Sequence, residues 1–188
     1  MNIITKTTEL AMEVTLKYIE PGDMVIDATC GTGRDTVALA CATGETGRVV
    51  AFDIQEEALS MTEDRLKESG FSNYELKLES FKNMGSYVPE KSAACVVFNL
   101  GYLPGGNHSI TTEAEETIQG LEAALKVIRT GGVITVVLYD GHPEGKAEKQ
   151  RVLDWAGKLD SKKYHVGYVN FLNQRNEPPE ILWITKKA

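Results

Sequence analysis

The chain has 188 residues, of which 42% are hydrophobic and 25% are charged, and its formal net charge is −7. A chain of this size can bury a core without disulfide or metal staples. No apolar run approaches the roughly 20 residues of a membrane helix, and the first residues lack the apolar core of a signal peptide. The three cysteines are too few and too scattered for a disulfide framework or a zinc site, so we expect a reduced, cytoplasmic protein.

The negative charge is uneven along the chain. Residues 146–188 carry nine lysines and arginines against five acids, whereas residues 1–145 carry 11 against 22. An acidic protein is poorly suited to broad electrostatic binding of nucleic acid. A polyanionic partner would therefore meet the C-terminal part, although a solvated helix face explains the same lysines.

Apolar residues recur in two alternating patterns. Helical spacing, as for Leu59, Thr62 and Leu66, alternates with short apolar runs such as residues 93–98, which are typical of buried parallel strands. The pattern predicts helices at about 6–19, 35–42, 55–68, 112–128 and 146–159, a short helix at 80–88, and a turn at 130–132. It predicts strands at about 24–28, 48–53, 74–79, 93–98, 133–139, 164–171 and 180–186.

Alternating strands and helices predict an α/β fold. We expect a doubly wound, mostly parallel seven-stranded sheet with helices on both faces. The last two strands are joined by a short loop, which indicates an antiparallel edge pair. No linker divides the chain, so residues 1–188 are expected to form one domain.

The first strand leads into a glycine-rich turn at residues 27–33. Gly31 and Gly33 suit a turn in which the backbone approaches a ligand closely, and its N–H groups are expected to face that ligand. Asp53 ends the second strand, where a carboxylate suits the two ribose hydroxyls of a nucleoside cofactor. Two alternatives remain: the glycines could serve helix–strand packing alone, and Asp53 could cap the helix that starts near Gln55.

This turn departs from the dinucleotide-binding fingerprint. Thr36 stands where the third glycine would be, and Asp35 occupies the helical turn that would hold a pyrophosphate. Asp27 would also repel a pyrophosphate, while it would attract a cationic ammonium or sulfonium. S-adenosylmethionine therefore fits better than NAD.

Residues at later strand ends complete the predicted cofactor site. Ile54 and Gln55 would neighbour the adenine, and Ser80 and Phe81 would flank the base, although Phe81 also suits the core. The predicted cofactor-binding residues are Asp27, Thr29, Gly31, Gly33, Asp35, Thr36, Asp53, Ile54, Gln55, Ser80, Phe81, Asn99 and Leu100.

Four blocks carry a resemblance to a known family. They are Asp-Ala-Thr-Cys-Gly-Thr-Gly at 27–33, Phe-Asp-Ile-Gln at 52–55, Asn-Leu-Gly-Tyr-Leu-Pro-Gly-Gly at 99–106, and Tyr-Asp-Gly-His-Pro-Glu-Gly at 139–145. With these blocks the chain resembles the MnmM (YtqB-like) family of class I S-adenosylmethionine-dependent methyltransferases, formerly labelled rRNA methylases. The resemblance implies a Rossmann-like fold and methylation of the amine of 5-aminomethyluridine at the tRNA wobble position. Where the family commonly has histidine, this chain has Arg34 and Phe81.

The resemblance also suggests where the chemistry occurs. Asn99 to Tyr102 lies where many amine methyltransferases carry Asn-Pro-Pro-Tyr. By analogy, the Asn99 side-chain oxygen and the Leu100 carbonyl would accept the amine hydrogens; the alternative for Asn99 is a turn-forming role. His142 could take the amine proton or serve only as a loop residue. The predicted catalytic residues are Asn99, Tyr102, Asp140 and His142, and the predicted substrate-binding residues are Gly101, Tyr102, Pro104, Gly105, Gly106, Tyr139, His142, Asn173 and Arg175.

The leading hypothesis is an S-adenosylmethionine-dependent N-methyltransferase that makes 5-methylaminomethyluridine in tRNA without a metal ion. The alternatives are methylation of rRNA, a protein amide or a small amine, and, from another class, a non-catalytic NAD-sensing module. The expected partner is the anticodon stem-loop of tRNA, which would be read by splaying and stacking its bases. No membrane association is expected, and a homodimer is a further candidate assembly.

Overall fold

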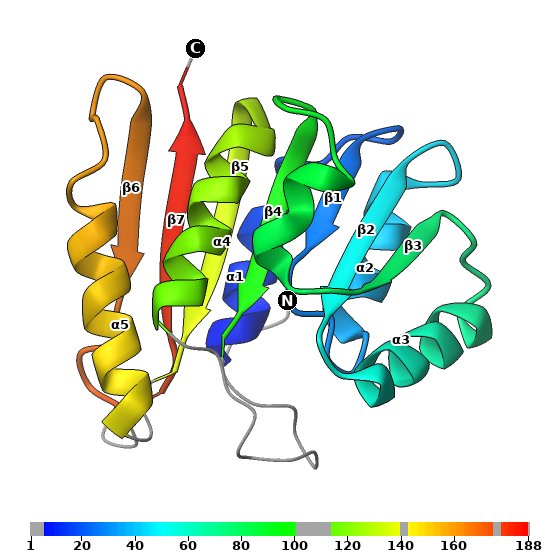
Figure 1. Cartoon of the computed structure of the whole chain (residues 1–188), viewed down its shortest axis with the longest axis horizontal. Coiled ribbons are helices and arrows are strands. Elements are labelled where there is room, and N and C mark those ends of the chain that lie inside the picture. The colour runs from blue at the N-terminus through cyan, green and yellow to red at the C-terminus, as the bar shows by residue number, and fades with distance from the viewer. Residues whose placement is uncertain (1–5, 101–113, 140–142, 175–177, 188) are drawn as a thin grey trace.

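The described residues form a mixed β-sheet with helices on both of its faces (Figure 1). The structure is a computed structural model that describes residues 6–100, 114–139, 143–174 and 178–187. The helices are α1 (Thr7–Leu16), α2 (Arg34–Thr43), α3 (Glu56–Glu68), the 3-10 helix η1 (Phe81–Ser86), α4 (Ala114–Val127) and α5 (Pro143–Ala156). The strands are β1 (Met24–Asp27), β2 (Arg48–Asp53), β3 (Tyr74–Leu78), β4 (Ala93–Asn99), β5 (Ile128–Leu138), β6 (Tyr164–Val169) and β7 (Glu180–Lys186).

The strand order of the sheet is β3-β2-β1-β4-β5-β7-β6. The first five strands pair in parallel, whereas β7 is antiparallel to both β5 and β6. The chain begins in the middle with β1, moves outward to β3, and returns to the other side of β1 with β4. The order therefore reverses between β1 and β4, and ligands of open α/β sheets bind at the carboxyl ends of such a strand pair. The predicted sheet with its antiparallel edge pair is confirmed.

Both faces of the central strands are covered. Helices α1, α2 and α3 pack on one face, and η1, α4 and α5 pack on the other (Figure 1). In β4, Cys95 and Val97 contribute to the core beside α2, whereas Val96 and Phe98 contribute to the core beside α4. Each such apolar side chain stabilises the fold by about 1.5–3 kcal/mol. This two-sided burial explains the continuous apolar run that the sequence shows at 93–98.

The junction between α4 and β5 differs from the prediction. A helix to residue 128, a turn at 130–132 and a strand from 133 were expected, but β5 already begins at Ile128. Between the pairs Ala93↔Ile128 and Cys95↔Val133, β4 advances by fewer residues than β5, so the extra residues bulge out of the ladder. Gly131 lies in this bulge with a φ of 75°, a conformation that favours glycine. The glycines thus accommodate a bulged strand and do not terminate a helix.

Helix α4 lies close to η1 because Gly120 has no side chain. A Cβ at Gly120 would lie 2.3 Å from Cδ2 of the Phe81 ring. That ring is 8% exposed and packs edge-on against Phe98, with ring centroids 5.5 Å apart. The Phe81 ring therefore belongs to the core, as the alternative interpretation of this residue held, and it does not present a face for stacking on a cofactor base.

None of the helices in the described residues is both long enough and apolar enough to cross a membrane. The same residues also contain no group of three or more His, Cys, Asp or Glu side chains placed to hold a metal ion.

Replacing Gly120 with Ala should destabilise the protein. Although alanine favours helices over glycine, the added methyl group would overlap the Phe81 ring, and overpacking of this kind costs about 1–3 kcal/mol. Urea unfolding of Gly120→Ala should show that loss, whereas Gly85→Ala, where no atom lies within 4 Å of the new Cβ, should stay within about 0.5 kcal/mol of the parent protein. A Gly120→Ala variant as stable as the parent would contradict this packing.

Candidate active site

The turn between β1 and α2 has the glycine-dependent geometry that the sequence predicted. Gly31 and Gly33 have φ values of 51° and 78°. A Cβ at Gly33 would lie 2.8 Å from Cα of Thr62 in α3. Gly33 therefore also allows α3 to approach the turn closely, which differs from the helix–strand packing considered as its alternative role.

Most backbone N–H groups of this turn donate within the protein. The expectation that they face a ligand is therefore wrong for five of them. The five bonds run from Ala28 to the Val97 carbonyl (2.8 Å), from Cys30 to the Phe52 carbonyl (2.9 Å), from Gly33 to the Cys30 carbonyl (2.8 Å), from Thr29 to Oδ1 of Asp27 (3.2 Å) and from Gly31 to Oδ2 of Asp53 (3.0 Å). Because these five N–H groups already have acceptors within the protein, they are not free to bind a pyrophosphate.

Asp53 connects the ends of β1 and β2. Its Oδ2 accepts the Gly31 N–H, and its Oδ1 accepts the Gln55 N–H at 3.0 Å. The N-cap position of α3 is Gln55, so Asp53 is not the helix cap that was considered. A carboxylate has about four acceptor positions, so two remain for ribose hydroxyls. Ile54, which follows Asp53, is 56% exposed.

Asp27 is the most deeply buried acid of the site, with 1% of its surface exposed. The Thr36 hydroxyl donates to its Oδ2 at 2.6 Å, and the Thr29 N–H donates to its Oδ1. Burial and then the nearby charge of Asp35 raise the pKa of Asp27 to about 7. A cation placed beside this carboxyl would lower its pKa and favour the carboxylate.

Asn99 ends β4 directly beside the turn that follows β1. Its backbone N–H donates to Oγ1 of Thr29 at 2.8 Å, and its side-chain Nδ2 donates to Oδ2 of Asp35 at 3.5 Å. These contacts link β4 to the first loop and to α2, so the Asn99 side chain does more than form a local turn. Leu100 follows with 1% exposure, and its N–H donates to the Val137 carbonyl at 3.1 Å.

Helix α3 supplies two contacts that the sequence analysis missed. The Thr62 hydroxyl donates to the Gly31 carbonyl at 3.2 Å, and Nε of Arg65 donates to the Thr32 carbonyl at 2.7 Å. These side chains hold the carbonyl groups of the turn from a segment about 30 residues later in the chain. No local pattern in the sequence could have pointed to them.

The remaining predicted residues lie at the same edge or outside the described part of the chain. Ser80 precedes η1 and is partly buried, and Tyr139 follows β5. Asn173 is exposed after β6, which runs parallel to β5 because both strands are antiparallel to β7. Eight residues lie outside the described ranges: Gly101, Tyr102, Pro104, Gly105, Gly106, Asp140, His142 and Arg175.

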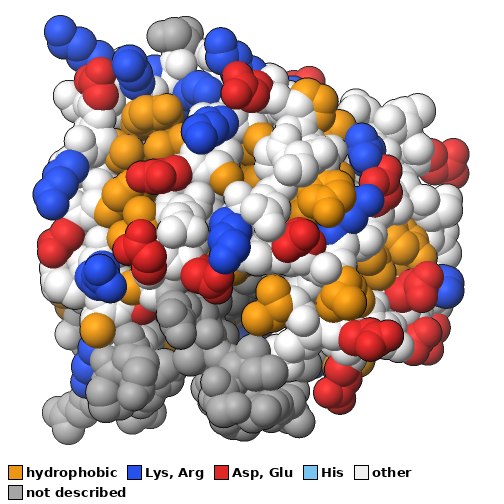
Figure 2. All heavy atoms as spheres, in the orientation of Figure 1, with side chains coloured by type: hydrophobic (Ala, Val, Ile, Leu, Met, Phe, Trp, Pro, Cys, Tyr) orange, Lys and Arg blue, Asp and Glu red, His pale blue; other side chains and the backbone are white. Residues whose placement is uncertain are grey.

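Among the described residues, the basic side chains of the C-terminal part do not form one patch at this edge. Lys158, Lys162 and Lys163 follow α5, and Lys187 follows β7, at the opposite end of the sheet. In Figure 2 basic side chains accordingly gather along the upper edge, whereas acidic side chains gather over α3. Several of the basic residues that are clustered in the C-terminal sequence thus lie at the end of the sheet opposite the candidate active site.

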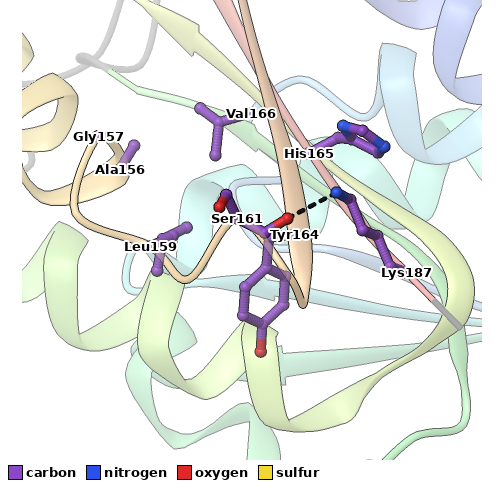
Figure 3. Close-up of a pocket in the computed structure, with 8 residues that line it drawn as sticks. All are labelled: Ala156, Gly157, Leu159, Ser161, Tyr164, His165, Val166 and Lys187. Carbon is purple, nitrogen blue, oxygen red and sulfur yellow. Dashed lines mark hydrogen bonds between the residues drawn. The ribbon is translucent and has the colours of Figure 1, made fainter.

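A cavity at that opposite end is separate from the candidate active site. It has a volume of about 280 Å³ and is lined by residues that follow α5 and begin β6 (Figure 3). Nζ of Lys187 donates to the Ser161 carbonyl at 2.6 Å across it. None of the predicted site residues that the structure describes lines it.

Comparisons with known proteins agree with this geometry. The family model described as "Putative rRNA methylase" matches residues 49–185. A crystal structure of a putative rRNA-methylase from Clostridium thermocellum is 40% identical, with a TM-score of 0.95 over 98% of this chain and 100% of that chain. A putative methyltransferase from Streptococcus mutans, solved in complex with SAH, is 32% identical, with a TM-score of 0.88 over 98% of this chain and 99% of that chain.

Two curated relatives have more specific names. A chloroplastic tRNA (mnm(5)s(2)U34)-methyltransferase from Arabidopsis thaliana is 41% identical over 157 residues, which are 78% of this chain and 57% of that protein. The demethylmenaquinone methyltransferase of Bacillus subtilis is 40% identical over 153 residues, which are 78% of this chain and 60% of that protein. The chain therefore spans less than two thirds of the length of either relative.

These findings confirm the family, the fold and the cofactor that the sequence predicted. The family model matches well over half of the chain, and the Clostridium thermocellum and Streptococcus mutans proteins match it over nearly its whole length. The chain belongs to the family described as "Putative rRNA methylase", within the class I S-adenosylmethionine-dependent methyltransferases.

Proposed function

We propose that this protein methylates the amine of 5-aminomethyluridine at the tRNA wobble position and so forms 5-methylaminomethyluridine. The observation that carries the proposal is the position of Asn99 at the carboxyl end of β4, beside β1, with its Nδ2 bonded to Asp35. The name of the Arabidopsis thaliana relative supports the same substrate class.

The residues at the first two strand ends fit S-adenosylmethionine. Asp53 has acceptor positions for the ribose hydroxyls. Asp27 is a buried acid for which the described residues supply no lysine or arginine partner. A cationic cofactor would therefore supply a charge that this site lacks. When bound, the cofactor supplies an electrophilic methyl group on a sulfonium.

Asn99 is suited to orient a neutral amine. Because its Nδ2 is directed to a carboxylate, its Oδ1 is left to accept an amine hydrogen. Together with the Leu100 carbonyl, this oxygen would aim the nitrogen lone pair and stabilise the positive charge that develops during an in-line transfer. In this proposal Tyr102 would stack on the uracil, Asp140 would bind the substrate ammonium and His142 would take the amine proton.

Residues 1–188 would form one domain that acts in the cytoplasm and binds the anticodon stem-loop, with a homodimer as a candidate assembly. The second candidate substrate is rRNA, which the description of the family favours. The two substrates differ in the nucleoside that gains the methyl group, so one assay separates them.

The substrate assignment predicts a specific product. Purified protein incubated with S-adenosylmethionine and tRNA bearing 5-aminomethyluridine should convert that nucleoside to 5-methylaminomethyluridine, as measured by mass spectrometry of digested RNA. Transfer RNA without the aminomethyl group should gain nothing. A methyl group found only on added rRNA would favour the second candidate and reject the first.

Asn99→Ala should reduce turnover by about 100- to 1000-fold, because a preorganised hydrogen-bonding group of the transition state is removed. Binding of S-adenosylmethionine, measured by calorimetry, should change little. The control is Asn83→Ala, which removes an exposed asparagine of η1 and should keep full activity. An Asn99→Ala variant with undiminished turnover would reject the proposed role.

Cofactor affinity should rise as pH rises through about 7. The carboxylate of Asp27 is the form that a cation favours, and its pKa is raised to about 7 by burial, with Asp35 and Asp53 adding to the shift. Binding should therefore be about tenfold weaker at pH 6 than at pH 8, and it should release protons near pH 7. Calorimetry in two buffers of different ionisation enthalpy measures both; an affinity independent of pH would contradict the assignment.

The Asp27 carboxyl also affects stability: as pH rises, cofactor binding should become tighter, whereas the cofactor-free protein should become less stable. The pKa of Asp27 is higher in the folded protein than its ordinary value of 3.8, so the cofactor-free fold holds an extra proton between pH 4 and pH 7. As pH rises from 4 to 7, the free energy of unfolding of the cofactor-free protein should therefore fall by on the order of a few kcal/mol. Asp27→Asn, which cannot ionise, should remove this part of the pH dependence in urea unfolding.

A further inference from the structure

Asn99 is held from two directions by side chains of the β1–α2 segment. Oγ1 of Thr29 accepts its backbone N–H at 2.8 Å, and Oδ2 of Asp35 accepts from its Nδ2 at 3.5 Å. The Thr29 N–H is in turn bound to Asp27, 3.2 Å away. The backbone of Asn99 is thus fixed by one contact and its amide group by another.

The amide contact decides which way the Asn99 side chain faces. An asparagine amide has a donor end and an acceptor end of nearly the same shape, and rotation about the last side-chain bond exchanges them. An ionised carboxylate only accepts hydrogen bonds, so the donor end must face Asp35. Without that carboxylate, both orientations of the amide would be populated.

The position of Asp35 bears on whether its carboxyl is ionised. It lies in the first turn of α2, where the helix dipole favours a negative charge. On balance the pKa of Asp35 is raised, because the effect of burial exceeds those of the hydrogen bond from Asn99 and the charge of Arg34, which both lower it. The contact with Asn99 therefore favours the ionised form that the contact requires.

We propose that Asp35 is a positioning residue, whose carboxylate orients the Asn99 amide so that Oδ1 faces the substrate amine. This inference rests on the proposed function of Asn99. It differs from the role that the sequence suggested for Asp35, which was direct binding of the cofactor. The two roles have different consequences, because a cofactor ligand changes cofactor affinity and a positioning residue changes turnover.

The test compares Asp35→Ala with Asp35→Asn and with the control Asp64→Asn, which changes an exposed acid on α3. Because the amide loses the carboxylate that orients it, Asp35→Ala should lower kcat by about 10- to 100-fold. At pH 8, where most of the Asp27 carboxyl is ionised with or without Asp35, the Kd for S-adenosylmethionine should stay within about twofold. Asp35→Asn keeps an acceptor oxygen of the same shape and should lose less activity, and the control should lose none.

Nuclear magnetic resonance gives a readout that does not depend on turnover. The side-chain NH2 signals of Asn99 are identified by their absence from Asn99→Ala. In Asp35→Ala they should shift and broaden because the amide is released, whereas in Asp64→Asn they should stay in place. A role of Asp35 confined to the stability of α2 would leave these signals unchanged.

The outcomes separate this inference from the proposed function. Loss of cofactor binding in Asp35→Ala, with unmoved Asn99 signals, would overturn the positioning role and make Asp35 a cofactor ligand. Unchanged kcat in a folded Asp35→Ala would also overturn it. If the parent protein methylates no tRNA, the proposed function fails, and the Asn99 signals of Asp35→Ala still decide whether Asp35 orients the amide.

Discussion

The buried carboxyl of Asp27 is the constraint on which the candidate active site depends. It ends β1 with 1% exposure, and its hydrogen bonds with the Thr36 hydroxyl and the Thr29 N–H tie the strand to α2 and to the following turn. Thr29 then binds the N–H of Asn99, so the contacts of one acid extend to the end of β4. The two strands between which the sheet reverses its order are thereby held in register at the ends that form the candidate active site.

An acid in this position is unfavourable for the protein alone. Desolvation of a carboxylate costs several kcal/mol unless a cation or hydrogen bonds compensate, and the described residues bring hydrogen bonds and further acids to Asp27. Asp35 and Asp53, whose pKa values are also raised by burial, lie in the same region. Buried acids that lower stability in this way are expected at functional sites. Here they are consistent with a site that is completed by a positively charged cofactor.

The tertiary structure assigns separate tasks to residues that look alike in the sequence. Asp53 and Asp27 both end strands. Asp53 accepts hydrogen bonds from two backbone N–H groups, one in the loop after β1 and one in the loop after β2, whereas Asp27 is buried and accepts a hydrogen bond from the Thr36 hydroxyl. Gly33 serves both the turn and the approach of α3. Thr62 and Arg65 of α3 hold carbonyl groups of the turn. The turn is therefore shaped as much by its neighbours as by its own glycines.

The sequence by itself determined the order of the elements, the doubly wound sheet and the edge that carries the site, because hydrophobic periodicity and the position of residues after strands are local features of the chain. It also determined the choice of a cationic cofactor, since Asp27, Asp35 and Thr36 stand where a pyrophosphate site would need other residues. Only the tertiary structure decided that Phe81 belongs to the core, that Gly131 and Gly132 form a bulge in β5, and that Asp35 faces Asn99. Each of these depends on the close approach of segments distant in the chain, which depends on packing and leaves no periodic signal in the sequence.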